Sequence, residues 1–287
     1  MKLGFSANAY KRFDLLTTMD TLQEIGFDGI EILCDIPHAY PPDLTPARRQ
    51  EIKARAENNG LKICNLNAFM LYALGDCWRP SYIEKEASER RKRINHTLSC
   101  IDLAAEWGVP HLSIEPGGPL DGAKEDWALD VFEEAIHELA EHAEKKGVTV
   151  MIEPEPELLI ETSGQFLKFM ERISSPRIGL NFDIGHFYCA GEDPVQLVSQ
   201  LAAYTKHYHL EDISNSRIHH HLVPGEGAID FRAVLNEIAK TNYDGFITIE
   251  LYPYEEDPVP ATKKAFEYIS PILQELTRTK TAINGSR

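Results

Sequence analysis

The sequence has little of what marks disulfide-rich, membrane-spanning or secreted proteins. It contains five cysteines in 287 residues, none spaced as Cys-x-x-Cys, which favours a reducing compartment over a disulfide framework. No apolar run approaches the roughly 18–20 residues that cross a bilayer. The opening MKLGFSANAY has one lysine and no long apolar stretch, so we expect no secretory signal. These features predict a cytoplasmic protein without a membrane partner.

Several catalytic motifs are absent as well. The sequence has no Gly-x-Gly-x-x-Gly after its first apolar run, no Gly-x-x-x-x-Gly-Lys-Ser/Thr, no Gly-x-Ser-x-Gly and no His-Glu-x-x-His. Dinucleotide binding, Walker-type phosphate chemistry and serine acyl transfer therefore have no support. Cations are in deficit, because 29 Lys and Arg oppose 45 Asp and Glu, for a net charge of −16. Since non-specific nucleic-acid binding depends on cationic contacts to phosphate, we expect no nucleic-acid partner.

The sequence does contain a regular alternation of apolar runs and amphipathic stretches. Eight runs are expected to be strands: Leu3–Ser6, Gly29–Leu33, Lys62–Asn65, His111–Ile114, Val148–Ile152, Ile178–Phe182, His207–Leu210 and Phe246–Ile249. Eight stretches are expected to be helices: Leu15–Ile25, Pro46–Asn59, Ile83–Trp107, Asp126–Lys146, Ser163–Ile173, Pro194–Thr205, Asp230–Thr241 and Pro260–Glu275. This order predicts one (β/α)8 TIM barrel domain over residues 1–277 with a polar tail over 278–287; a doubly wound open sheet is the competitor.

Four polar residues stand just after, or at the end of, the last four apolar runs. They are Glu153, Asp183, His209 and Glu250, at intervals of 30, 26 and 41 residues. In a barrel, residues at the carboxyl ends of the strands meet at one rim. Three carboxylates there would repel one another unless a cation lay between them. We therefore predict one divalent ion bound by all four; the donor set favours Mn²⁺, with Mg²⁺, Co²⁺ or Zn²⁺ as alternatives.

Further residues are candidates for contact with a substrate. The segment Asp-Ile-Gly-His lets His186 point back toward the predicted ion, because Gly185 relaxes the turn. The segment Ser-Arg-Ile-His-His-His could bind an anion, a substrate hydroxyl or a second metal, and a solvated loop is the alternative. Glu115 stands at the end of the fourth run. Both a contact with substrate and a role in positioning a loop stay open for it. The predicted substrate-binding residues are His186, Arg217, His221 and Glu115.

Two other features bear on the predicted site. The longest insertion, Ala68–Tyr82, follows the third apolar run and contains Phe69, Tyr72 and Trp78, so we expect it to hang over the same rim as a lid. Glu31 lies inside the second apolar run, where a buried, hydrogen-bonded carboxylate is expected.

The chain resembles the sugar phosphate isomerase/epimerase family of xylose isomerase-like barrels. The segments that carry this resemblance are Ile152-Glu153-Pro154, Asn181 to His186, His207 to Asp212, His221 with Pro224-Gly225-Glu226-Gly227, and Ile249-Glu250. The resemblance implies that the Glu, Asp, His and Glu bind one divalent ion and that the two glutamates transfer protons. It also implies that His186 and Arg217 contact substrate.

These observations predict a divalent-metal-dependent sugar or sugar-phosphate isomerase or epimerase. In this hypothesis Glu153 and Glu250 act as base and acid through a metal-stabilised enediolate. Three alternatives stay open: an inosose-type dehydratase, an endonuclease IV-like phosphodiesterase and a non-catalytic carbohydrate-binding barrel. Two departures are Glu211, where the family often has Lys, and His219, where the nuclease would have an Asp ligand. Barrels of this size commonly self-associate, so a homo-oligomer is also open.

Overall fold

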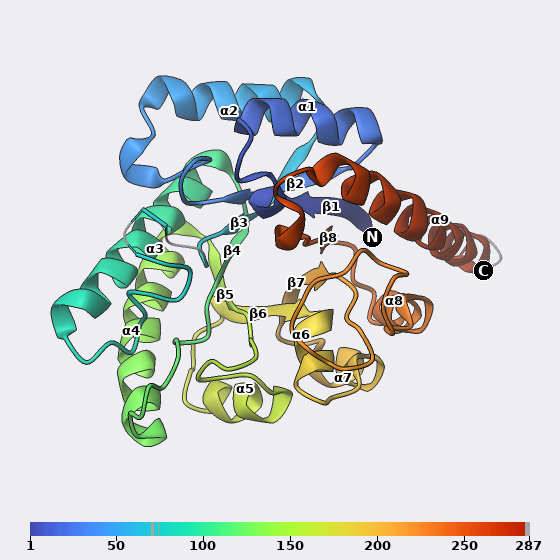
Figure 1. Ribbon diagram of the computed structural model, residues 1–287. Helices are drawn as coiled ribbons and strands as arrows, with labels where there is room; N and C mark the ends of the chain where they lie inside the picture. Colours follow the sequence, from blue (N-terminus) through green and yellow to red (C-terminus); the bar gives the residue numbers. More distant parts are fainter. Residues whose placement is uncertain (70–71, 74, 285–287) are drawn as a thin grey trace.

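A computed structural model describes residues 1–69, 72–73 and 75–284 of the chain. Eight parallel strands pair in sequence order and close into a barrel, with β1 bonded to both β2 and β8 (Figure 1). The strands are β1 Lys2–Ser6, β2 Gly29–Leu33, β3 Lys62–Asn67, β4 His111–Ile114, β5 Thr149–Ile152, β6 Ile178–Asp183, β7 Thr205–Leu210 and β8 Phe246–Ile249. Closure confirms the predicted (β/α)8 barrel and excludes the open sheet.

The α-helices form a ring outside the strands (Figure 1). They are α1 Leu15–Ile25, α2 Pro46–Asn58, α3 Ala87–Trp107, α4 Glu125–Lys146, α5 Ser163–Met170, α6 Ile184–Cys189, α7 Pro194–Leu201, α8 Phe231–Lys240 and α9 Pro258–Asn284. Short 3-10 turns lie at η1 Ala7–Tyr10, η2 Pro41–Asp43 and η3 Tyr252–Tyr254. Within the described residues, no helix combines the length and the apolar character needed to cross a membrane.

The helix ends follow local sequence signals in several places. Asp230 caps α8, because its carboxylate accepts a hydrogen bond from the backbone nitrogen of Ala233 at 3.0 Å. Gly147 ends α4 with a φ of 71°, a left-handed conformation that glycine adopts without steric cost. The predicted helix through Thr205 was wrong at its end: α7 stops at Leu201, and Thr205 begins β7. Helix α9 continues to Asn284, past the boundary expected at residue 277.

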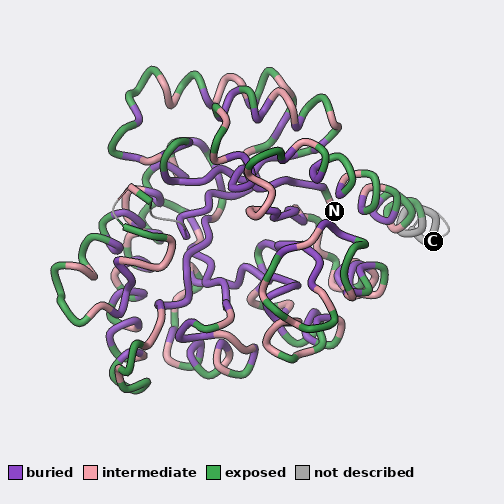
Figure 2. Tube along the Cα trace, in the orientation of Figure 1, coloured by how far each residue is buried: buried purple, intermediate pink, exposed green. Residues whose placement is uncertain are grey.

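The apolar core lies between the strands and the surrounding helices, and Figure 2 shows the barrel strands as almost entirely buried. The interior of the barrel, by contrast, contains fully buried polar side chains from several strands. Glu31 of β2 accepts hydrogen bonds from Ser6 Oγ at 2.6 Å and from Asn65 Nδ2 at 2.8 Å. Glu31 is therefore the buried, hydrogen-bonded carboxylate expected from the sequence. Its Oε2 also lies 2.6 Å from Nε2 of His209, one of the residues at the rim.

Candidate metal centre

The four residues predicted to bind metal converge at the carboxyl ends of β5 to β8. One donor atom from each of Glu153, Asp183, His209 and Glu250 lies within 4.8 Å of the donor atoms of the other three. Glu153 and Glu250 follow directly on β5 and β8, whereas Asp183 and His209 lie within β6 and β7. All four side chains are buried. Barrel closure thus gathers donors that are far apart in the sequence.

His209 lies between two carboxylates. Its Nδ1 is 2.7 Å from Oε1 of Glu153, and its Nε2 is 2.6 Å from Oε2 of Glu31. Burial alone would lower the pKa of His209, but the two carboxylates outweigh burial and hold the pKa well above its usual value. Because Glu31 accepts the proton on Nε2, Nδ1 is the nitrogen that faces the cluster. This pairing is the one by which proteins orient a histidine toward a metal ion.

The acidic groups of the cluster crowd one another. The pKa of Glu250 is raised well above its usual value, mainly by burial and also by the nearby Glu153, with His209 acting in the opposite direction. Asn8 donates a hydrogen bond from Nδ2 to Oε1 of Glu250 at 2.7 Å. Glu211, buried against Asp183, also has a strongly raised pKa through burial and then through repulsion from Asp183. A dication would relieve this repulsion, so the residues fit a divalent ion chemically.

A cavity of about 370 Å³ opens above this cluster. Aromatic side chains form part of its wall, and Phe69, Tyr72 and Trp78 among them come from the loop 68–82. The loop therefore lies over the rim, as predicted, although residues 70, 71 and 74 lie outside the described part of the chain. The described residues that line the cavity include no lysine or arginine: Asn8, Asn67, Phe69, Tyr72, Cys77, Trp78, Glu153, Glu155, Glu157, His186, Ile218, His219, Glu250 and Tyr252.

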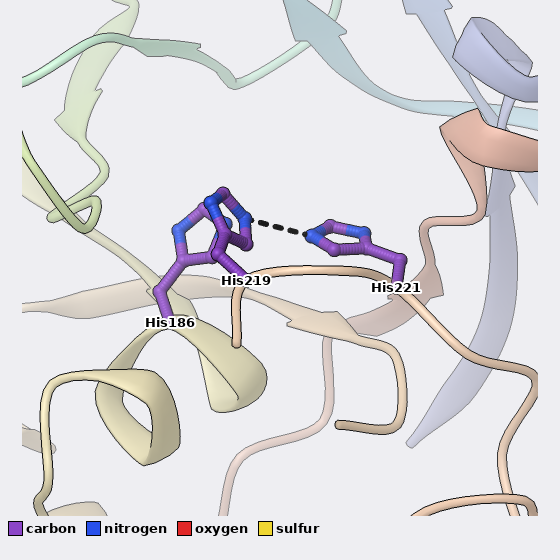
Figure 3. Close-up of side chains that lie close together, drawn as sticks. All are labelled: His186, His219 and His221. Carbon is purple, nitrogen blue, oxygen red and sulfur yellow. Dashed lines mark hydrogen bonds between the residues drawn. The ribbon is translucent and has the colours of Figure 1, made fainter. Parts of the chain in front are cut away.

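Two of the predicted substrate-binding residues lie beside the cluster of predicted metal ligands. His186 of α6 lines the cavity, and His221 is fully buried next to it, with both rings close to His219 (Figure 3). Asp183 connects this group to the cluster, because its Oδ1 accepts a hydrogen bond from the backbone nitrogen of His186 at 2.7 Å. His186 and His221 thus lie where the sequence placed them, and their contact with substrate stays a prediction.

The guanidinium of Arg217 contacts Tyr188. Nη1 donates to the carbonyl oxygen of Tyr188 at 2.5 Å, and the guanidinium carbon lies 4.1 Å from the centre of the Tyr188 ring. Arg217 has a φ of 57°, uncommon for a residue with a side chain. It is not among the described residues that line the cavity, so a contact with substrate would require Arg217 to leave Tyr188.

Glu115 is fully buried and lies 3.0 Å from Nη2 of Arg93, which is also fully buried. Burial raises the pKa of Glu115 to about 8, against the opposing effect of Arg93. Arg93 also donates to the carbonyl oxygens of Phe69 at 2.7 Å and Pro80 at 2.8 Å. Of the two roles left open by the sequence, these contacts favour positioning of the loop 68–82.

Two polar residues that line the cavity, Glu155 and Asn8, were not among the predicted site residues. Glu155 is 5% exposed, and its pKa is raised well above normal by burial and then by Glu153. The alternation Glu153-Pro154-Glu155 directly after β5 was a signal for it, since a second acid there also faces the rim. Asn8 follows β1, and its position at the end of a strand would have identified it.

Comparisons with known proteins agree with this fold. A family model described as xylose isomerase-like TIM barrel matches residues 19–272. The chain is 27% identical over 286 residues to fructoselysine 3-epimerase of Shigella flexneri, covering 96% of this chain and 99% of that protein. Its fold is similar to that of a D-tagatose 3-epimerase-like protein, with a TM-score of 0.82, 24% identity and coverage of 97% and 99%. It is also similar to the IolI protein determined with a bound zinc atom, with a TM-score of 0.80, 18% identity and coverage of 96% and 99%. Since the family model spans most of the chain, the protein belongs to the family of xylose isomerase-like TIM barrels.

Proposed function

We propose that this protein is a divalent-metal-dependent isomerase or epimerase of sugars or sugar phosphates. The observation that carries the proposal is the convergence of Glu153, Asp183, His209 and Glu250 beneath a cavity of about 370 Å³. That volume lies within the range of small-molecule sites. Similarity to fructoselysine 3-epimerase along nearly the whole chain supports an isomerase-class enzyme. The oxygen-rich donor set favours Mn²⁺, with Mg²⁺, Co²⁺ or Zn²⁺ as alternatives.

The two glutamates are proposed to transfer the protons. A divalent ion bound at the cluster would act as a Lewis acid that stabilises negative charge on the oxygens of the reacting sugar. Glu153 and Glu250 both line the cavity, so one carboxylate can remove a carbon-bound proton while the other returns one. Asn8 holds Oε1 of Glu250 and orients this carboxylate.

The remaining residues are proposed to bind and shield the substrate. His186 and His219 present ring nitrogens near the cavity, whereas Arg217, His221 and Glu115 are set farther back. The aromatic side chains of the loop 68–82 would exclude water from the reacting carbon. Return of the proton to the opposite face of the same carbon gives an epimer, and return to the neighbouring carbon gives an isomer.

The proposal is tested by proton exchange. The metal-free protein is loaded with Mn²⁺ or Co²⁺ and incubated in D2O with ketoses, ketosamines and sugar phosphates, and the quenched, chelated mixtures are analysed by NMR. We expect deuterium at one carbon together with an epimer or isomer. Loss of water from the product would instead indicate a dehydratase, and no exchange with any substrate would favour a non-catalytic barrel.

Variants test the role of the glutamates. Replacement of Glu250 or Glu153 by Gln should lower the exchange rate by about 10²- to 10⁴-fold, the usual contribution of a positioned acid or base. Glu157→Gln is the matched control, since Glu157 also borders the cavity but is exposed and gives no donor atom to the cluster. Equal losses in all three variants would refute the assignment.

A further inference from the structure

Glu155 is a buried acid in the wall of the cavity. Its side chain is 5% exposed and lines the cavity together with those of Glu153 and Glu250. Its backbone is held in a short loop, because its nitrogen donates to the carbonyl oxygen of Ile160 at 3.1 Å and its carbonyl oxygen accepts from the nitrogen of Leu158 at 3.3 Å. The carboxylate of Glu155 is therefore offered to the cavity from a fixed position.

This carboxylate has no partner of opposite charge. Within the described part of the chain, no group donates a hydrogen bond to it and no Lys, Arg or His forms an ion pair with it. The other buried acids of the wall do have partners: Glu250 accepts from Asn8 at 2.7 Å, and Glu153 lies 2.7 Å from Nδ1 of His209. Because a buried carboxylate without a donor is costly, Glu155 indicates a partner that enters the cavity from outside.

The cavity stays negative even with a divalent ion in the proposed metal centre. Glu153, Asp183 and Glu250 bring three negative charges to that centre, and one dication offsets two of them. Glu155 and Glu157 add further acids to the wall, and its described residues include no Lys or Arg. Since a cavity lined by one sign of charge concentrates the field, a phosphate would be repelled there and an ammonium group attracted.

Basic side chains near the wall do not supply the missing charge. Lys11, which contacts an aromatic residue of the wall, forms an ion pair with Glu255 at 3.0 Å. The guanidinium of Arg217 lies on the ring of Tyr188. Burial lowers the pKa of His219 to about 3, so this ring is neutral at pH 7 although it lines the cavity. A cation for the unpaired acid is therefore expected to arrive with the ligand.

We propose that Glu155 binds a positively charged amino group of the substrate, and that the cavity takes amine-bearing sugars in preference to sugar phosphates. This inference rests on the proposed function, because it names a substrate class for the same site. The rings of Phe69, Tyr72 and Trp78 suit such a ligand, since aromatic faces attract cations. A neutral sugar would leave the charge of Glu155 unbalanced, and a phosphate would add repulsion.

The experiment compares three sugars that differ only at the first carbon: 1-amino-1-deoxy-D-fructose, D-fructose and D-fructose 1-phosphate. Their affinities for the Mg²⁺-loaded protein are measured at pH 7 by ligand-observed NMR, because Mg²⁺ is diamagnetic. We expect the amine to bind at least about tenfold more tightly than fructose, since hydrogen bonds between charged groups are the stronger ones. We expect the phosphate to bind most weakly. An amine that binds no better than fructose, or a phosphate that binds as well as the amine, would overturn the inference.

Glu155→Gln removes the charge and keeps the shape of the side chain. It should weaken binding of the amine by at least about tenfold and change the affinity for fructose by less than about threefold. Glu157→Gln is the matched control, since Glu157 is an exposed acid in the same wall. Because exposed charges are screened, it should weaken the amine by less than about threefold. Thermal unfolding checks that both variants are folded. Equal losses in the two variants, or an equal loss for amine and fructose in Glu155→Gln, would refute the role of Glu155.

Failure of this inference is distinguishable from failure of the proposed function. The affinities report binding whether or not the sugar reacts, whereas the isomerase is tested by deuterium exchange in D2O. Exchange on a neutral sugar or a phosphate, without a preference for the amine, would overturn the inference alone. A preference for the amine without exchange on any sugar would refute the isomerase alone.

Discussion

Glu31 should set the affinity of the proposed metal centre although it is not one of the four predicted donors. Its Oε2 lies 2.6 Å from Nε2 of His209, so this carboxylate holds the ring with Nδ1 toward the cluster and increases the basicity of Nδ1. In Glu31→Gln the charge is lost, and the new amide must lie among the donors Ser6, Asn65 and Asn67. We expect the affinity for Mn²⁺ or Co²⁺ to fall by about 10- to 100-fold, which corresponds to roughly 1.4–2.7 kcal/mol of binding free energy.

Isothermal titration of the metal-free variant measures this loss directly. Ser6→Ala is the control, because Ser6 bonds to Oε1 of Glu31 and leaves the contact between Oε2 and His209 intact. Thermal unfolding without metal separates a loss of stability from a loss of affinity. If Glu31→Gln binds the metal within twofold of the unmodified protein while remaining folded, the carboxylate does not act through His209 and our reasoning is wrong.

Three further predictions concern stability. Saturation with Mn²⁺ at 100 times its dissociation constant should stabilise the fold by about 2.7 kcal/mol, seen as a higher melting temperature that EDTA reverses. The pKa of Glu115 is about 8 in the folded protein. Protonated Glu115 therefore stabilises the fold fully below the pKa that this carboxyl has in the unfolded chain, and the stabilisation is lost as pH rises toward 8. Between pH 5 and pH 8 the melting temperature of Glu115→Gln should therefore fall less than that of the unmodified protein. An equal fall in both proteins would contradict this. Gly185→Ala should lower the melting temperature, because its methyl group would overlap Oε1 of Glu211; an unchanged value would show that Glu211 moves aside.

Much of the fold could be predicted because each strand is a short apolar run bounded by helix signals. Gly147 and Asp230, for example, mark helix ends through local conformation and local hydrogen bonds alone. Helix α6 was missed because it begins directly after β6 and is only six residues long, too short for an amphipathic period. The end of α7 was misplaced because the turn before Thr205 continues the composition of the helix.

The convergence of four donor side chains could be predicted from their positions at the ends of strands, but the partners of each side chain could not. The contact between Glu31 and His209 joins residues 178 positions apart and depends on the register of the closed barrel. Arg217 illustrates the same limit, because its direction is set by Tyr188 of a neighbouring helix. Contacts of this kind arise from tertiary packing, which local sequence patterns do not encode.

Arg93 holds both ends of the loop that lies over the cavity. Its guanidinium, which comes from α3, donates hydrogen bonds to the carbonyl oxygens of Phe69 and Pro80. These two residues lie close to the two ends of the loop. The side chains of this stretch that face the cavity, Tyr72 and Trp78 among them, can therefore be exchanged without removing the contacts that hold its two ends. Substitutions of these side chains would then reshape the wall of the cavity while Arg93 and its buried partner Glu115 keep the ends of the loop in place.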